Sequence, residues 1–458
     1  MSDWKLHTPK GVNDILPAEC TQKKEIQDTI WSVFAAFGYK EVETPTFEYY
    51  DCFSGVDGQI SQEGMFKFFD EQGRILTLRP DITTSIARMA ATKQGETKRP
   101  LRFCYTGNVY RADRTEGVRQ REFTQSGIEL IGSYSPDADA EVIAAAIEAA
   151  LACGIEELHM EIGQVAFFAG LTEQAGLNSA DIEKIRERID SKDTTGIKAI
   201  IKDLDIAEDV KSLMIELPYL FGGLEVLEKA DVSGLNEKSK TALSNIRRIY
   251  ELLCLYGLED YVSIDLGMLQ SIDYYTGSIF KCYTHGVGFP ICAGGRYDTL
   301  MEKFGEKEGA VGVAFGINRL ISALGKKEQK EIEGSLVYPE KNAEGIAYDI
   351  AYTLRQYGIM VEQYINGGNI EDAEKYAREL GRDSVIRVFP DAKVQVMEFS
   401  NDEIVETTAE DFINFYGEEE HDHDHGECDC GHHHEHGESC DCGHHHEHGE
   451  DCDCGHCH

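Results

Sequence analysis

The sequence predicts an α+β fold, and two observations carry this prediction. Residues 101–111 and 121–132 are apolar-rich runs typical of strands, and the polar residues 113–120 between them indicate a hairpin turn. Residues 136–153 are rich in alanine, and residues 22–37 repeat apolar side chains at helical spacing, so both segments favour helices. Strands and helices therefore share one body rather than forming separate all-α and all-β parts.

The elements that follow predict a core over residues 1–325. Helix signals dominate residues 173–256, which indicates a helical insertion within that core. Further strands are expected at 262–266, 278–283 and 309–315.

The second half of the chain divides into three segments of different character. The charged segment GKKEQKEIEG, residues 325–334, is typical of a linker. Residues 335–416 alternate strand and helix patterns, which predicts a small α/β domain. Residues 418–458 repeat a unit resembling GECDCGHHHEH and lack apolar residues for a core, so this tail is expected to be disordered.

Charge and cysteine content restrict the partners and the compartment. The chain holds 83 Asp and Glu against 44 Lys and Arg, and only 14 of those acids lie in the tail. Because nucleic-acid binding relies on Lys and Arg to neutralise phosphates, a large tRNA footprint is not expected. No apolar run is long enough to cross a membrane, no signal sequence is evident at the start, and seven cysteines are scattered singly through the body. We therefore expect a cytoplasmic protein.

The tail carries seven Cys and 13 of the 16 His of the chain. Thiolate and imidazole groups are good ligands for zinc, nickel or copper, but the C-x-C spacing and the missing apolar frame do not suit a structural zinc site. The sequence predicts loose binding of a transition metal, and a merely solubilising acidic tail is the alternative. The candidate ligands are Cys428, Cys430, Cys440, Cys442, Cys452, Cys454, His432 and His444.

Two blocks in the core suggest a ligand pocket. In LRPDITTSIAR, residues 78–88, Asp81 either accepts hydrogen bonds from a ligand ammonium or caps the following helix. In the predicted strand after the hairpin, Gln125 and Glu129 fall on one face and form a partly polar pocket floor. Arginines around the turn suit a phosphate or carboxylate, although a solvated surface with salt bridges would show the same pattern.

A third block, QSIDYYTG at residues 270–277, is followed by GGRYD at 294–298 and by AVGVAFGINRL at 310–320. The glycines allow close approach of a backbone or a ligand. Tyrosine hydroxyls and Arg319 could contact that ligand, while each of these residues alone could equally serve packing.

Taken in this order, the blocks resemble class II aminoacyl-tRNA synthetases, and histidyl-tRNA synthetase in particular, over roughly residues 5–325. GYKEVETPTFE, residues 38–48, looks like motif 1, residues 110–123 look like motif 2, and GVAFGINRL looks like motif 3. The resemblance implies an antiparallel sheet flanked by helices and self-association through the motif 1-like region. It also implies that residues 335–416 are a degenerate anticodon-binding domain.

The resemblance implies roles for individual residues of a histidine site. Asp81 and Thr83, assisted by Gln125, would hold the α-amino group, and Arg111 would lie near the carboxylate. Glu129 and Tyr274 would bind the imidazole, and Tyr275 would close the pocket.

The nucleotide side of the site departs from the synthetase pattern. Gln270 stands where that pattern has an arginine, Asp113 replaces a glutamate, and Asn318 precedes Arg319 in place of a glutamate. Asp81 likewise replaces a glutamate, and Arg121 belongs to the same degraded site. Loss of one preorganised cation costs about 10²–10³-fold in rate, so we expect histidine binding without aminoacylation.

This combination resembles the regulatory subunits of ATP phosphoribosyltransferase. The resemblance implies a non-catalytic subunit that joins a short-form catalytic subunit, supports the first step of histidine biosynthesis and responds to histidine as an effector, with no required cofactor. A divergent histidyl-tRNA synthetase is the alternative, and a metal-handling protein with an incidental core is a third hypothesis.

Overall fold

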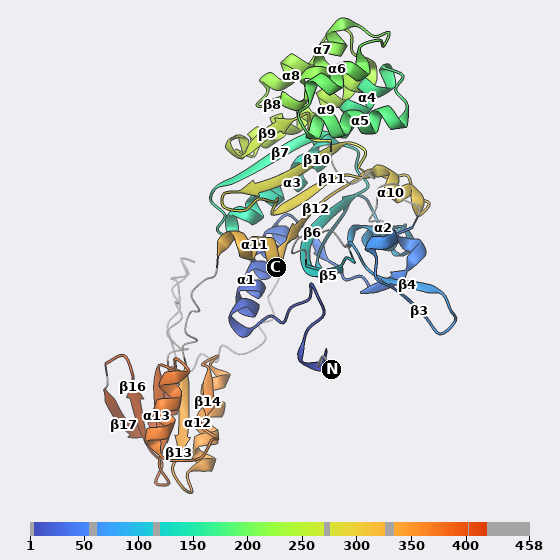
Figure 1. Cartoon of the computed structure of the whole chain (residues 1–458). Coiled ribbons are helices and arrows are strands. Elements are labelled where there is room, and N and C mark those ends of the chain that lie inside the picture. Colours follow the sequence, from blue (N-terminus) through green and yellow to red (C-terminus); the bar gives the residue numbers. More distant parts are fainter. Residues whose placement is uncertain are drawn as a thin grey trace, which may run out of the picture. The chain divides into compact units, whose positions relative to one another are not determined.

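The structure, a computed structural model, describes residues 4–54, 62–112, 120–269, 275–325, 334–401 and 403–418. It divides into two compact units, Met1–Gln329 and Lys330–His458 (Figure 1). The segment 325–334, expected to be a linker, contains this division, but its residues 326–333 lie outside the described part of the chain.

The first unit is built on a nine-stranded sheet with the order β1-β5-β6-β12-β11-β10-β7-β9-β8. The pairs from β5 to β7 in this order are all antiparallel, as the resemblance implies for a class II sheet, while β1–β5 and β7–β9 are parallel. The strands are β1 (Lys40–Glu41), β5 (Leu101–Tyr110), β6 (Glu122–Ile131), β7 (Leu158–Gln164), β8 (Phe221–Gly222), β9 (Val262–Asp265), β10 (Ser278–Thr284), β11 (Cys292–Arg296) and β12 (Ala310–Gly316).

Two long helices cover one face of this sheet. They are α1 (Pro17–Ala36) and α3 (Pro136–Ala152), which contact each other and the strands β6 and β12. Their buried side chains, among them Ile30, Phe34 and Ile143, belong to the largest apolar cluster of the unit. Burial of this apolar face stabilises the unit and leaves the opposite face of the sheet available for a site.

The opposite face is bordered by α2 (Thr83–Lys93) and α10 (Asp298–Lys303). Ile82 and Ile86 pack there with Phe103 and Tyr105 of β5 in a second apolar cluster. A separate three-stranded sheet has the order β2-β4-β3 and consists of β2 (Phe47–Tyr49), β3 (Lys67–Phe69) and β4 (Ile75–Leu78). The short helix η2 (Tyr50–Cys52) contacts both β4 and α2. The motif 1-like region, residues 38–48, thus runs through β1 and into β2.

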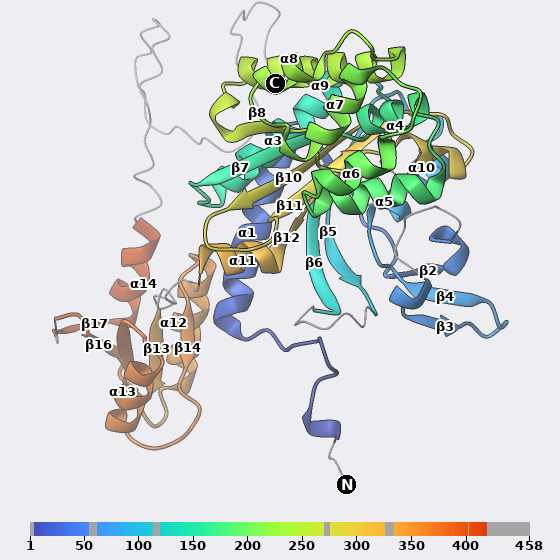
Figure 2. The same cartoon turned by 45° about the horizontal axis from the view of Figure 1, so that its top comes forward.

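The helical insertion lies at one end of the sheet, as Figures 1 and 2 show in green. Its first helix begins at Val165, eight residues before the expected start, because Gln164 leaves β7 and caps it by accepting from the backbone N–H of Ala166. The helices are α4 (Val165–Gln174), α5 (Ser179–Asp190), α6 (Thr194–Ile201), α7 (Glu208–Glu216), α8 (Glu225–Ala230) and α9 (Glu237–Leu255).

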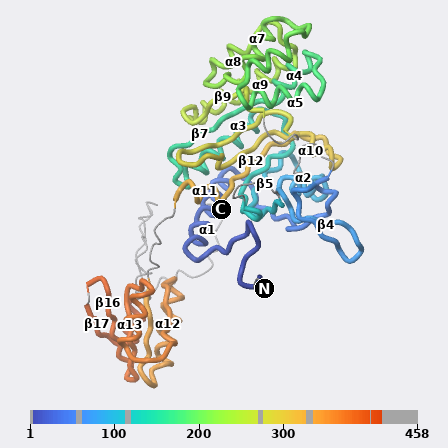
Figure 3. Tube along the Cα trace, viewed as in Figure 1, coloured from blue at the N-terminus to red at the C-terminus, as the bar shows by residue number. Residues whose placement is uncertain are grey.

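The second unit is a five-stranded sheet with the order β14-β13-β15-β16-β17 and three helices (Figure 3). The first three strands of this order are parallel and the last two pairs are antiparallel. Its elements are β13 (Ser335–Pro339), α12 (Glu344–Gln356), β14 (Val361–Gln363), α13 (Ile370–Glu379), β15 (Ser384–Val388), β16 (Lys393–Glu398), β17 (Ile404–Thr408) and α14 (Ala409–Glu418).

The strands β11 and β17 and the helix α14 are among the elements that the sequence did not predict. β11 carries two glycines, which disfavour strands, but it is held on both sides by β10 and β12. β17 is almost fully exposed, so it has no buried face that would show as alternation of apolar residues. The following helix, α14, packs through Ala409 and Phe412. No described helix is both long and apolar enough to span a bilayer.

Candidate functional site

A row of small residues hollows the free face of the main sheet. Glu129 of β6 lies opposite Gly312 of β12, which lies opposite Gly295 of β11. A Cβ atom on Gly312 would fall 1.7 Å from Oε2 of Glu129, and one on Gly295 would fall 2.8 Å from the ring of Tyr275. The glycines therefore make room for side chains that fold over them, which explains why the sequence places glycine at these positions of two strands.

Glu129 is the central acidic group of this hollow. Only 1% of it is exposed, and it accepts hydrogen bonds from Thr83 Oγ1 at 2.7 Å and from the Tyr297 hydroxyl at 2.5 Å. Burial raises the pKa of Glu129 to about 7 because the charged carboxylate is poorly solvated. Near neutral pH this carboxyl group therefore exchanges readily between acceptor and donor states, which suits an imidazole partner.

The residues at the start of α2 form the second wall. Asp81 Oδ1 accepts from the backbone N–H of Thr84 at 2.9 Å. The carboxylate therefore makes the helix-capping contact that was one of the two interpretations of Asp81. Burial raises the pKa of Asp81. A cap uses only part of the four lone-pair sites of a carboxylate, so the geometry leaves room for a ligand ammonium as well.

Arg111 and Gln125 lie at the mouth of the hollow. Arg111 Nε donates to the carbonyl of Pro80 at 3.1 Å, next to Asp81, and its guanidinium lies over the ring of Phe123 at 5.3 Å. Gln125 is partly buried and stands in register between Gly107 and Gly316.

The buried hydroxyl of Tyr105 points to a ligand in this hollow. Within the described residues no hydrogen bond of ordinary geometry is found for it, but it lies close enough to Thr83 and Glu129 to interact with both. Buried hydroxyls normally have a partner, and the neighbouring Glu129 makes the hollow the natural place for one. Sequence reasoning missed both Tyr105 and Tyr297. The one sequence signal for either residue was the GGRYD block, which contains Tyr297.

A buried ion pair supports the hollow from below. Arg296 Nη2 lies 2.5 Å from Asp139 Oδ2 of α3, and the Ser278 hydroxyl donates to the same carboxylate. The Asp139 charge raises the pKa of Arg296 against the opposing effect of burial. This network ties β10, β11 and α3 together and fixes the strand from which Tyr297 follows.

The nucleotide-side candidates are less closely grouped. Asn318 Oδ1 accepts from the backbone N–H of Thr124 at 3.3 Å, whereas Arg319 is exposed, lies over the Phe289 ring and donates to the Pro290 carbonyl at 2.8 Å. The side chain of Arg121 lies against Gly11. None of these contacts gathers cations around the Glu129 hollow.

Several candidates lie outside the described residues. They include Asp113, Gln270 and Tyr274, together with the arginines at 114 and 119. The eight candidate metal ligands of the tail lie outside them too. Among the residues that the structure does describe, no group of three or more His, Cys, Asp and Glu is arranged to hold a metal ion.

Comparison with known proteins places this fold and hollow in a family. The histidyl-tRNA synthetase family model matches residues 11–320. The ATP phosphoribosyltransferase regulatory subunit of Acetivibrio thermocellus is 46% identical over 90% of this chain and 100% of its own length. That of Ruminiclostridium cellulolyticum is 41% identical over 90% and 100%.

Solved structures of related proteins have the same fold. An ATP phosphoribosyltransferase regulatory subunit/histidyl-tRNA synthetase from Bacillus halodurans has a TM-score of 0.74 and 32% identity, covering 84% of this chain and 98% of that one. Histidyl-tRNA synthetase from Nostoc has a TM-score of 0.73 at 22% identity, over 90% of this chain and 99% of that one, and shows the shared fold alone. The chain is similar to its regulatory-subunit relatives along nearly the whole sequence, and it shares the synthetase-like core. It therefore belongs to the family of ATP phosphoribosyltransferase regulatory subunits.

Proposed function

We propose that this chain is the histidine-sensing regulatory subunit of an ATP phosphoribosyltransferase, acts in the cytoplasm and requires no cofactor. Its partner is the short-form catalytic subunit, which it activates in the first step of histidine biosynthesis. The Glu129 hollow carries the proposal because it offers a buried carboxyl group with a pKa of about 7 beside the buried hydroxyl of Tyr105. The free cysteines at the seven body positions suit a reducing compartment.

Histidine would bind with its imidazole at Glu129 and its ammonium at Asp81. Arg111 would lie toward the carboxylate, Thr83 and Gln125 would assist at the ammonium, and Tyr274 and Tyr275 would complete and close the pocket. A ligand shifts activity only if it binds two conformations unequally. The proposal therefore requires that histidine affinity differ between the free chain and its complex with the catalytic subunit.

We further propose that the chain does not aminoacylate tRNA. Gln270 stands where the synthetase pattern has an arginine, and Asn318 stands where that pattern has a glutamate. A body with 69 acids in residues 1–417 against 44 bases also suits tRNA poorly. The alternative, a divergent histidyl-tRNA synthetase, rests on the same histidine pocket.

Three measurements on the full chain test these proposals. Co-purification with the short catalytic subunit should succeed, and calorimetry should show saturable histidine binding that changes in the complex. Histidine-dependent pyrophosphate exchange should stay at background. Exchange at an ordinary synthetase rate would replace the regulatory proposal by the alternative, and loss of histidine binding both alone and in complex would remove the sensor.

Self-association is proposed through the three-stranded sheet, which the motif 1-like region enters. Its apolar side chains are unusually exposed, with Phe47 54%, Phe69 72% and Ile75 42% exposed. Exposed apolar groups gathered on one small sheet mark an interface. Light scattering should show a dimer or larger species of the wild type, and Phe47→Ser with Phe69→Ser should shift it toward the monomer. An unchanged mass in the double variant would contradict this surface.

The tail is proposed to bind zinc, nickel or copper loosely through its Cys and His residues. Its supporting observation is the gathering of seven Cys and 13 His within residues 418–458.

The residues 335–416 are proposed to stabilise or regulate the assembly. The second unit is shared by the Acetivibrio thermocellus relative, whose match spans its entire length.

A further inference from the structure

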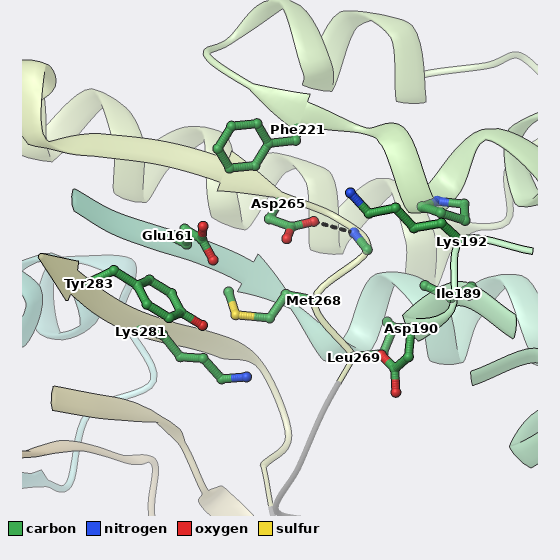
Figure 4. Close-up of a pocket in the computed structure, with 12 residues that line it drawn as sticks. Glu161, Ile189, Asp190, Lys192, Phe221, Asp265, Met268, Leu269, Lys281 and Tyr283 are labelled. Carbon is green, nitrogen blue, oxygen red and sulfur yellow. Dashed lines mark hydrogen bonds between the residues drawn. The ribbon is translucent and has the colours of Figure 1, made fainter. Parts of the chain in front are cut away.

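A second cavity, of about 430 Å³, lies on the same sheet face as Glu129 but nearer the helical insertion (Figure 4). Ile279 of β10 pairs with Gly295, so its side chain lies on the same sheet face as Glu129. Lys281 follows Ile279 by two residues on the same strand and therefore lies on that face too. The cavity volume falls within the range of about 300–1,000 Å³ usual for small-molecule sites.

The strands supply charged groups that lack direct partners. Glu161 of β7 lies in register opposite Lys281. Among the described residues, neither side chain makes a hydrogen bond or an ion pair, and Asp265 accepts from two backbone N–H groups, that of Gly267 at 2.8 Å and that of Met268. Burial, and then the charge of Asp265, raises the pKa of Glu161, and burial lowers the pKa of Lys281. Partly buried charges of this kind raise the free energy of the folded chain unless a group of opposite charge binds next to them.

Lys192 adds a second cation at an unusual backbone position. It follows α5 with φ of +53°, a left-handed conformation in which glycine is the ordinary residue after a helix. Its ammonium lies 5.8 Å from the Tyr219 ring, and in Figure 4 the side chain extends toward Asp265. A lysine in place of glycine there suggests a use for the ammonium beyond ending the helix.

The rest of the lining is mixed. It includes the apolar side chains of Ile189, Pro218, Phe221, Met268 and Leu269, together with the Tyr283 ring and a third carboxylate, Asp190. Figure 4 shows the Phe221 ring and the Tyr283 ring at different places around the cavity, with Met268 near Tyr283. Apolar side chains beside a few convergent charges are the usual composition of a site for a small organic ligand.

We propose that this cavity is a second ligand site, which binds an α-amino acid with an apolar or aromatic side chain. Glu161 and Asp265 hold the ammonium, Lys281 and Lys192 hold the carboxylate, and the side chain packs against Phe221 and Met268. A single carboxylate or a single amine would leave one set of charges unmatched. The proposal does not depend on histidine occupying the Glu129 hollow.

Saturation-transfer NMR on the full chain tests this with two probes, L-phenylalanine and L-leucine, because the proposed function already expects L-histidine to bind at the Glu129 hollow. At least one should bind saturably, and both Glu161→Gln and Lys281→Met should weaken it roughly tenfold or more, since each removes a contact to a charged group. Lys192→Gly should also weaken binding, and the backbone conformation there suits glycine, so the fold should persist.

Two control variants separate this site from its surroundings. Glu187→Gln makes the same charge change as Glu161→Gln on an exposed position of α5 and should leave binding intact. Glu129→Gln should also leave it intact. The inference is overturned if no probe binds saturably, if the Glu161 and Lys281 variants bind as well as wild type, or if Glu129→Gln removes the signal. This last result would assign the binding to the Glu129 hollow and leave the proposed function standing.

Discussion

Glu129 is the residue on which the proposed histidine site most depends. Its carboxyl group has a pKa of about 7 because burial disfavours the ion, although Thr83 and Tyr297 both donate to it. An imidazole also titrates near neutral pH, so the pair can share one proton in either arrangement. An aliphatic side chain of similar size would give the carboxyl group no partner on the ligand, and the net loss of one such hydrogen bond is about 0.5–1.5 kcal/mol.

The first prediction concerns stability against pH. Between about pH 4.5 and 7 the folded chain holds a proton on Glu129 that the unfolded chain has lost, so the free energy of unfolding should fall as pH rises through this window. The contribution amounts to up to about 3 kcal/mol. Glu129→Gln should remove this part of the slope and be more stable than wild type at pH 8. Urea unfolding of both proteins across pH measures it, and parallel curves would contradict the assignment.

The second prediction concerns Tyr297. Removing its hydroxyl in Tyr297→Phe takes away a donor that favours the ionised carboxylate, so the pKa of Glu129 should rise further. Histidine affinity should increase from about pH 5.5 to 7.5 in the wild type, as Glu129 ionises, and the variant should show the same rise at higher pH. Calorimetry across pH measures both curves.

Tyr376→Phe is the matched control for this variant. Its hydroxyl likewise donates to a carboxylate, Glu362, at 2.9 Å, but in the second unit. It should leave the affinity curve unchanged. If both variants shift the curve alike, the effect does not come through Glu129.

At the scale of elements, the strands β6, β11 and β12 form the hollow by pairing glycines with large side chains. Gly312 is the tightest case, because a Cβ there would meet Glu129 Oε2 at 1.7 Å. The Arg296–Asp139 pair then fixes β11 to α3, so the hollow is held on a rigid base.

The third prediction therefore concerns Gly312→Ala. The added methyl group should push Glu129 from its position, cost about 1–3 kcal/mol of stability and remove histidine binding. Gly345→Ala is the control, since a Cβ at that position of α12 meets nothing within 4 Å. Thermal unfolding and calorimetry on both variants measure the contrast. A Gly312 variant that binds histidine normally would show that the carboxyl group can move without consequence.

At the scale of the whole molecule, the two units and the tail carry separable properties. The main unit holds both candidate ligand sites, while the second unit has its own apolar cores around Val337 and Leu336. The tail follows α14 in the sequence.

The fourth prediction follows from this separation. A chain that lacks residues 419–458 keeps α14 whole and should retain the unfolding temperature and histidine affinity of the full chain. It should lose most of its capacity for zinc, nickel and copper, as measured by equilibrium dialysis. Equal metal capacity in the two chains would reject the tail as the binding region, and a loss of histidine affinity would show that the tail acts on the core.

The sequence by itself determined the fold class, the strands of the central hairpin and the long helices, and it singled out Glu129, Thr83 and Asp81 as candidates, because apolar periodicity and the motif blocks are local signals. Only the tertiary structure decided that β11 is a strand, that Tyr297 donates to Glu129 and that Glu161 lies beside Lys281 at the second cavity. These facts depend on which strands become neighbours. Pairing brings together residues more than a hundred positions apart, and no local pattern encodes it.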